Sequence, residues 1–299
     1  MSKSSHLENL ERDGFVLIPS LLTPEQITTL RAAASQTITL ARSGNWPHVR
    51  TLPKQFPPWP IAPGTNPAAS GIWGVQFLMH PSLPASRTFT KAYFSSAITD
   101  IVKELLQCRD EDLVLELFNL LVRPDADFEL VWHRDDIPAS ATAEEEMARL
   151  GRGKGGGAGW PWHAQWNAAL WDDESLVVVP GSHARARTQV ERDAGPWEQG
   201  LPGEMRVRMK AGDVVFYNNN ILHRGVYLSG TERMTLHGSM GHVGGSQLRA
   251  RNVLQHGIGE WVRDVDLSGL EGEERARAEG MRERLVEMGA HTGGYSLEG

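Results

Sequence analysis

Apolar residues recur at helical spacing in two stretches of the first third of the chain. Residues 23–41 and 91–107 place apolar side chains three or four positions apart, which predicts two amphipathic helices. The first helix has a clear start, because Thr23 is a capping residue, Pro24 fits the first turn and Gln26 completes a capping box.

Two other stretches near the N-terminus lack this helical spacing of apolar residues. Residues 14–22 (GFVLIPSLL) form a short apolar run, which predicts a strand leading into the first helix. Residues 44–88 contain many prolines and little periodicity, which predicts a long irregular segment. Because such segments often form lids or pocket walls, we expect residues 44–80 to line a pocket, together with residues 137–162.

Beyond residue 113 the pattern becomes that of a β protein. Glycine, proline, asparagine and aspartate separate short apolar or alternating runs, which predicts a β barrel or sandwich. The predicted strands are 113–122, 128–133, 163–171, 175–181, 204–210, 213–218 and 233–243. With no internal repeat and no linker, we expect a single domain over residues 1–299. Its parts are the N-terminal helices (23–107), the β core (about 113–245) and a helical, charged tail (246–299).

Composition and charge exclude several classes of protein. The net charge of −7 and the lack of a lysine- or arginine-rich run argue against a nucleic-acid partner. No apolar stretch is long enough to span a membrane, and Cys108, the single cysteine, permits no intrachain disulfide and no cysteine zinc cluster. The polar N-terminus has no apolar region typical of a signal peptide, so we expect a cytoplasmic protein. The oligomeric state stays open.

Residues 151–156 (GRGKGG) match the glycine pattern of dinucleotide-binding loops. That pattern has this meaning only where it follows a strand and opens a helix. Here it follows TAEEEMARL, which predicts a short acidic helix capped by Thr142, and it precedes Trp160 and Pro161. We therefore interpret it as a loop between β elements.

An H-x-D pair stands at the end of the apolar run 128–133. In a strand, residues two positions apart point to the same face, so His133 and Asp135 direct an imidazole and a carboxylate at one point. The neighbouring Asp136 points the other way and is expected to cap a turn or support the ligands. A lone H-x-D pair is unspecific, because a chain with 11 histidines often contains one by chance.

His223 is the candidate for a third ligand. It follows GDVVFYNNNIL, in which a Gly-Asp turn and a strand return the chain to the same end of a barrel. His237 and His242 lie on the next predicted strand and are interpreted as packing residues. Two histidines and one carboxylate on one face form the facial triad of non-haem Fe(II) oxygenases, but catalytic zinc sites use the same ligand count.

Arg233 favours the iron oxygenase over the zinc enzyme, because oxygenases of this kind need a site for a co-substrate carboxylate. Its planar guanidinium is suited to a two-point grip on such a carboxylate. Thr235 lies two residues further along, on the same strand face, and adds a hydroxyl. Considered alone, Arg233 is better explained by a surface salt bridge with Glu232 or another acidic residue.

Taken together and in order, these motifs resemble the phytanoyl-CoA dioxygenase family, a branch of the Fe(II)/2-oxoglutarate-dependent oxygenases. The resemblance spans roughly residues 10–245. The motifs that carry it are the opening RDGFVLIPSLLTPEQITTLR, His133 and Asp135, the PGSH turn (180–183), GDVVFYNNNILHRG with His223, and Arg233 in RMT.

The resemblance implies a fold, cofactors and residue roles. The fold is mainly β with flanking helices, around a double-stranded β-helix (jelly roll, cupin-like) core. The cofactors are Fe(II), 2-oxoglutarate as co-substrate, and O2. The implied catalytic set is His133, Asp135 and His223 as iron ligands with Arg233 on the far carboxylate of 2-oxoglutarate, and further co-substrate contacts are assigned to Trp166, Asn119, Thr235 and Gln165. Relatives that halogenate have glycine or alanine in place of the carboxylate ligand, so Asp135 implies a hydroxylase-type enzyme.

The substrate is expected to be a small, largely apolar metabolite. The reaction expected is oxidation of a C–H bond with release of succinate and CO2. Trp46, Trp73 and Trp132 are the candidate pocket residues, although any of them equally well packs the core. Two rival interpretations stay open, a zinc-dependent enzyme and a non-catalytic ligand-binding protein, both on a cupin-like barrel.

Overall fold

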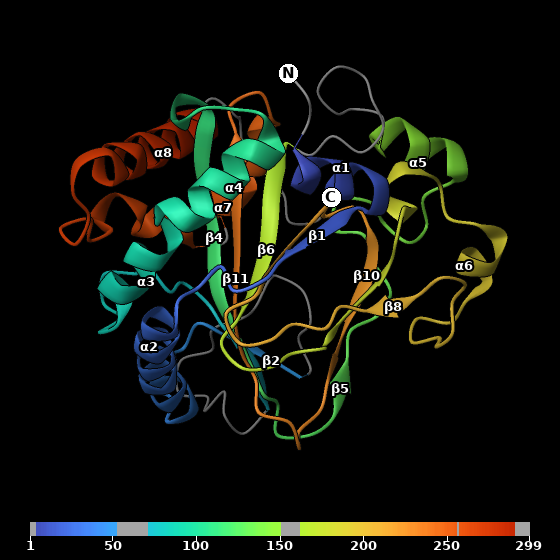
Figure 1. Cartoon of the computed structure of the whole chain (residues 1–299), viewed down its shortest axis with the longest axis horizontal. Coiled ribbons are helices and arrows are strands. Elements are labelled where there is room, and N and C mark those ends of the chain that lie inside the picture. Colours follow the sequence, from blue (N-terminus) through green and yellow to red (C-terminus); the bar gives the residue numbers. More distant parts are fainter. Residues whose placement is uncertain (1–3, 53–70, 151–161, 256, 291–299) are drawn as a thin grey trace.

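Two antiparallel sheets packed as a jelly roll form the centre of the molecule (Figure 1). The computed structural model describes residues 4–52, 71–150, 162–255 and 257–290. From one edge to the other, the larger sheet contains β1 (Phe15–Ile18), β9 (Val214–Tyr217), β6 (His163–Ala169), β11 (Met234–His242), β4 (Leu113–Val122), β3 (Ile72–Val75) and β2 (Val49–Thr51). The smaller sheet contains β5 (Phe128–Glu129), β10 (Leu222–Tyr227), β7 (Leu176–Val179) and β8 (Met205–Arg206). The predicted fold class is confirmed.

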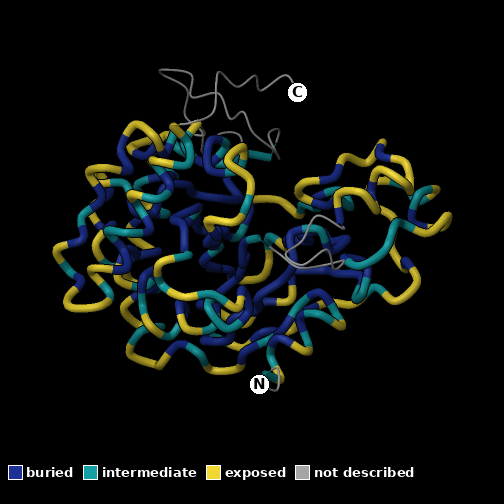
Figure 2. The backbone as a smooth tube through the Cα atoms, turned by 90° about the horizontal axis from the view of Figure 1, so that it is seen from above, coloured by how far each residue is buried: buried dark blue, intermediate teal, exposed yellow. Residues whose placement is uncertain are grey.

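Helices cover the outer face of the larger sheet, where α4 crosses in front of the long strands β4, β6 and β11 and α8 packs against β4 (Figure 1). The α-helices are α1 (Ser5–Asp13), α2 (Pro24–Arg42), α3 (Ser86–Tyr93), α4 (Ser96–Leu106), α5 (Ala143–Leu150), α6 (Gln189–Asp193), α7 (Gln247–Gln255) and α8 (Gly272–Ala290). Short 3-10 turns are η2 (Asp110–Asp112), η4 (Ser182–Ala184), η5 (Ile258–Glu260) and η6 (Val262–Asp264). Buried residues concentrate in the interior, with exposed residues along the outer turns (Figure 2).

Side chains of the larger sheet alternate between a helix-facing layer and an inner, cavity-facing layer. On β6, Ala164, Trp166 and Ala168 belong to the main apolar cluster under the helices. Gln165 and Asn167 point the other way, into a cavity between the sheets. The helix-facing layer is therefore the core, and the opposite layer is available for chemistry.

The helix predicted at residues 23–41 is confirmed, whereas the helix predicted at residues 91–107 is divided in two. α2 has the predicted capping box, with Thr23 accepting from the Gln26 backbone and Gln26 from the Thr23 backbone. The helix predicted at 91–107 is instead two helices, α3 and α4. The chain breaks at Ser95, whose backbone is extended and whose hydroxyl donates to the Ala92 carbonyl.

Two helices and three strands have no counterpart in the sequence-based prediction, namely α1, α6, β2, β3 and β10, the strand that carries His223. α1 forms within the polar N-terminus, capped by Ser4. β2 and β3 form within the segment expected to be irregular, and β3 extends the larger sheet by pairing with β4. The GRGKGG loop, Trp59 and Trp160 lie outside the described residues. The single-domain assignment stays a prediction, and no described helix is both long and apolar enough to cross a membrane.

Gly238 on β11 lies directly under the Trp166 ring, and an added Cβ would meet Trp166 Cζ2 at 2.3 Å. We therefore predict that Gly238→Ala lowers the free energy of unfolding by about 1–3 kcal/mol, because the packed ring has little room to move. Denaturant unfolding measures the change. Gly230→Ala is the matched control, since a Cβ there meets no atom within 4 Å. Equal stability of the two variants would contradict the tight packing of Trp166.

Candidate metal centre and cavity

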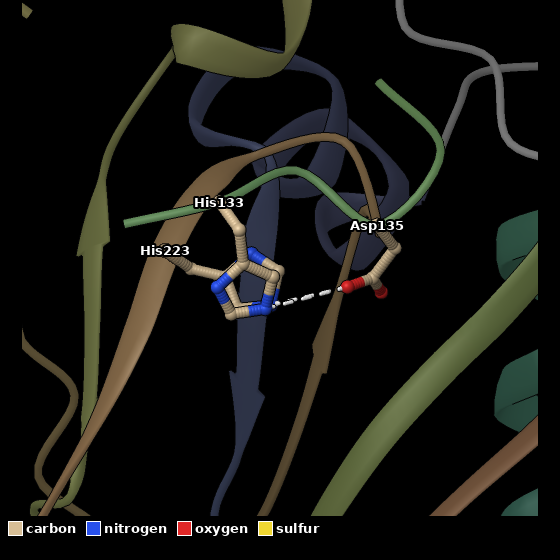
Figure 3. A group of neighbouring side chains, drawn as sticks. All are labelled: His133, Asp135 and His223. Atoms are coloured by element: carbon tan, nitrogen blue, oxygen red, sulfur yellow. Dashed lines mark ion pairs between the residues drawn. The ribbon is translucent and has the colours of Figure 1, made fainter. Parts of the chain in front are cut away.

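His133, Asp135 and His223 converge at the end of the smaller sheet (Figure 3). The segment after β5 runs antiparallel to the start of β10, and His133 and His223 exchange both backbone hydrogen bonds, at 3.0 and 3.1 Å. The backbone N–H of Asp135 donates to the Asn219 carbonyl at 2.9 Å. The sheet itself thus brings together two histidines that are far apart in the sequence.

Each histidine ring is held by a backbone carbonyl two residues earlier. Nδ1 of His133 lies 2.7 Å from the Val131 oxygen, and Nδ1 of His223 lies 2.8 Å from the Ile221 oxygen. A carbonyl accepts hydrogen bonds only, so each Nδ1 carries the proton and each Nε2 is left with a lone pair. This is the arrangement that a metal-binding imidazole requires.

The three ligand atoms face one small volume. Asp135 Oδ1 lies 3.5 Å from Nε2 of His133 and 3.7 Å from Nε2 of His223. All three atoms lie within 4.8 Å of one another. Ligands about 2.1 Å from a common ion are separated by roughly 3–3.5 Å, so the spacing fits a metal with little adjustment.

The charge states of the ligands also suit a cation. Burial, and then the neighbouring His223, lowers the pKa of His133 to about 4, so its ring is neutral at physiological pH. Burial alone would raise the pKa of Asp135, but the two histidines and a hydrogen bond from Gln165 hold that pKa below its usual range. Gln165 Nε2 donates to Asp135 Oδ2 at 3.0 Å, which leaves Oδ1 for the ion.

A cavity of about 270 Å³ adjoins all three ligands. Three predicted co-substrate residues, Asn119, Gln165 and Arg233, lie on its wall. Arg233 is buried against the Tyr227 ring, with Cζ 4.2 Å from the ring centroid. The surface salt bridge with Glu232, considered for Arg233 from the sequence, is not its main contact.

Asp173 fixes the Arg233 side chain. Its Oδ2 accepts from Arg233 Nε at 2.8 Å and from the Thr235 hydroxyl, while Oδ1 accepts from the backbone N–H and hydroxyl of Ser175. Thr235 is fully buried, and its hydroxyl serves this carboxylate instead of facing the cavity. The predicted contact between Thr235 and the co-substrate is therefore corrected to an indirect role, through Asp173 and Arg233.

The tryptophans are placed differently from one another. Trp73 lines the cavity, as predicted. Trp166 packs under the helices against Tyr93 and Phe216, so its expected position beside the co-substrate is corrected. Trp46 lies in the same apolar cluster and donates to the Gln76 carbonyl. Trp132 lines a second cavity of about 250 Å³ along the His133 segment.

Matches to known proteins agree with this geometry. The family model for phytanoyl-CoA dioxygenase matches residues 10–234, well over half of the chain. The chain belongs to the phytanoyl-CoA dioxygenase family. The resemblance inferred from the sequence is thus confirmed at the level of the family.

Solved structures similar to this family member share its fold. AviO1 from Streptomyces viridochromogenes Tue57 has a TM-score of 0.55 at 19% identity, covering 80% of this chain and 95% of AviO1. EctD from S. alaskensis, solved with 2-oxoglutarate and 5-hydroxyectoine, has a TM-score of 0.56 at 17% identity, covering 81% and 77%. HygX from Streptomyces hygroscopicus, solved with nickel and 2-oxoglutarate, has a TM-score of 0.54 at 17% identity, covering 81% and 87%. No curated protein matches the sequence.

Sequence reasoning missed several polar residues on the cavity wall of this phytanoyl-CoA dioxygenase family member. Asn167 and His237 hydrogen-bond to each other at 2.9 Å. Strand alternation from Gln165 and Arg233 would have placed both on the inner face. Burial, and then Arg50, lowers the pKa of His237 to about 3, so the ring is neutral. Strand alternation could not place Arg50 or Arg249 on the cavity wall. Arg50 lies on the short edge strand β2, and Arg249 lies on α7 in the C-terminal helical region.

Asp136 lies beside the ligands without joining them. It accepts a hydrogen bond from the Asn219 side chain, and half of its own side chain is exposed. This agrees with the supporting role predicted from strand alternation.

We predict that Gln165→Leu weakens metal binding by about 10- to 100-fold, the usual effect of removing a group that orients a ligand. Without the Gln165 hydrogen bond, the Asp135 carboxylate is free to rotate away from the ion. Isothermal titration with Co(II) measures the affinity. Gln189→Leu, on the exposed helix α6, is the control. An unchanged affinity in Gln165→Leu would show that the carboxylate is held by other contacts.

We predict that Asp173→Asn destabilises the protein by about 3–5 kcal/mol at neutral pH, because it leaves the buried Arg233 charge without its partner. Burial alone would raise the pKa of Asp173, but Arg233 and the hydroxyls around it hold that pKa below its usual range. The stabilisation is therefore present above about pH 4, the unfolded-state value, and is lost as pH falls through the folded-state pKa.

Denaturant unfolding of wild type and variant at pH 7 and pH 3.5 tests this sign. The difference between them should shrink at the lower pH. Asp125→Asn, which removes the exposed partner of Arg42, should change stability by less than about 1 kcal/mol. A difference that stays constant with pH would argue against a charge effect at Asp173.

Proposed function

We propose that this protein is an iron(II)- and 2-oxoglutarate-dependent oxygenase that oxidises a C–H bond of a small molecule and releases succinate and CO2. The observation that carries the proposal is a facial set of two imidazoles and one carboxylate opening onto a cavity with buried, unsatisfied donors. 2-Oxoglutarate agrees with the family and with the EctD and HygX structures, and iron agrees with the family and with an EctD structure solved with bound Fe.

The ligand set fits iron(II). His133, Asp135 and His223 would bind the ion through two Nε2 atoms and Oδ1, and the adjoining cavity leaves room for further ligands. When bound, the iron supplies activation of O2 coupled to decarboxylation of 2-oxoglutarate. The chain's own residues keep the imidazoles correctly oriented, and hold Asp135 through one oxygen.

Two buried donors on the cavity wall fit the co-substrate. Nη1 of Arg233 and Nδ2 of Asn119 are both buried and make no hydrogen bond to the described residues. A buried donor without a partner costs about 1–3 kcal/mol, which an acceptor such as a carboxylate oxygen would remove. Because Asp173 already holds Nε, the Arg233 fork presents its remaining N–H groups in a fixed direction.

The cavity favours a more polar substrate than the tryptophan content suggested. Its wall includes Arg50, Asn167 and His237, and its aromatic residues are Trp73, Phe77, Tyr217 and Tyr227. Hydroxylation is the outcome we propose, since Asp135 occupies the position that halogenating relatives leave open.

The first experiment is visible spectroscopy under argon. We expect metal-free protein with added Fe(II) and 2-oxoglutarate to show the weak, broad charge-transfer band of a chelated 2-keto acid. Asp135→Ala should abolish the band by removing a ligand, and Arg233→Gln should shift its appearance to at least about tenfold higher 2-oxoglutarate, because a charged hydrogen bond is lost.

Arg208→Gln is the control, since this arginine is exposed and its one ion pair within the described part of the chain is with Glu174. A chain that binds zinc but gives no band with iron would favour the zinc enzyme, and one that binds neither metal would favour a non-catalytic ligand-binding protein.

A further inference from the structure

A second cavity, of about 250 Å³, lies along the ligand segment 131–139. It shares His133 and Asp135 with the first cavity, and its wall continues through Ile137 and Pro138 to Arg187. The two cavities therefore meet at the metal ligands. The co-substrate donors, Arg233 and Asn119, belong to the first cavity alone.

Positive charge exceeds negative charge beside this second cavity. Four guanidinium groups, from Arg134, Arg185, Arg187 and Arg192, gather between the ligand segment and helices α5 and α6. Among the described residues only two buried carboxylates form ion pairs with them, from Glu146 and Glu191. Glu144 also lies near Arg192, but it is exposed to solvent.

Glu146 is shared by three of the four arginines. Its fully buried carboxylate accepts from Arg187 Nε and Arg192 Nη2, both at 2.5 Å, and lies 3.8 Å from Arg134 Nε. Glu191 is occupied by a two-point contact with Arg185. One carboxylate thus compensates three buried or half-buried cations, and an unbalanced buried charge is costly.

Two donors in this cluster are still open. Nε of Arg134 is buried and makes no hydrogen bond to the described residues. Arg187 uses Nε for Glu146 and Nη2 for the Ala139 carbonyl at 2.7 Å, and its Nη1 makes no hydrogen bond to the described part of the chain. Both arginines line the second cavity. An anion there would satisfy donors and balance charge at once.

We propose that the second cavity binds an anionic group, a carboxylate or a phosphate, of the substrate, with Arg187 as its main contact. This assignment rests on the proposed function. It restricts the expected substrate class from small molecules in general to small anionic molecules. It places the anion in the second cavity and the co-substrate in the first. The arginine cluster also ties α5 to the segment after η4, through the ion pairs of Glu146 with Arg187 and Arg192.

The test uses inorganic sulfate as the probe and the metal-loaded protein, with 2-oxoglutarate at saturation to fill the first cavity. Sulfate is titrated at low millimolar concentration against chloride of equal ionic strength, with thermal unfolding and the charge-transfer band as readouts. We expect a saturable rise in Tm and a change in the band for wild type. Arg187→Gln should weaken sulfate about tenfold, the loss of one charged hydrogen bond.

Matched variants separate binding from folding. Arg187→Lys keeps the charge and should bind sulfate between wild type and Arg187→Gln, while the exposed Arg208→Gln should match wild type. If Arg187→Gln does not fold, the measurement on wild type still tests the proposal. Sulfate and chloride that give the same Tm and the same charge-transfer band for wild type overturn it. Sulfate binding that is equal in Arg187→Gln and wild type overturns it too.

The two proposals fail in different ways. In one outcome, the protein shows no charge-transfer band, but sulfate still raises its Tm and Arg187→Gln loses that rise. The anion site is then supported and the oxygenase assignment is rejected. A protein with the band but no sulfate effect retains the oxygenase assignment and loses the anion site.

Discussion

The backbone pairing of His133 with His223 is the contact on which the site depends. Two reciprocal hydrogen bonds join the segment after β5 to the start of β10, and they bring the two imidazoles to a ring separation of 4.3 Å. Because each ring is also anchored to a carbonyl of its own strand, the ligand positions follow from main-chain geometry. A site built in this way is organised before any metal arrives.

Buried charge pairs are the second constraint. The arginines on the first cavity's wall include Arg224, Arg233 and Arg249, and each forms an ion pair with a carboxylate outside the cavity lining, from Glu129, Asp173 and Glu116 respectively. Such pairs contribute little net stability, because desolvation offsets their attraction. Their effect is orientation, since a guanidinium held through one edge presents the other edge in a fixed direction.

Charge also distinguishes the two cavities. Around the first, Arg224, Arg233 and Arg249 each pair with a carboxylate, and the open donors of Arg233 and Asn119 are suited to 2-oxoglutarate. Around the second, three arginines share Glu146. His133 and Asp135 line both cavities. With 2-oxoglutarate in the first cavity and an anionic substrate in the second, as we propose, each ligand would contact its own arginine.

The sequence by itself determined the fold class and the family, because strand alternation and motif order depend on neighbours along the chain. Spacing made His133, Asp135 and His223 candidates, and the family resemblance implied their role as ligands. Trp166 and Thr235 could not be placed, since the layer a strand residue faces and the partner that takes its hydroxyl are set by packing against distant elements. The same holds for Asp173 and the Glu146 cluster. Charge balance in a folded protein is decided by which side chains lie together, and only the tertiary structure brings those residues into contact.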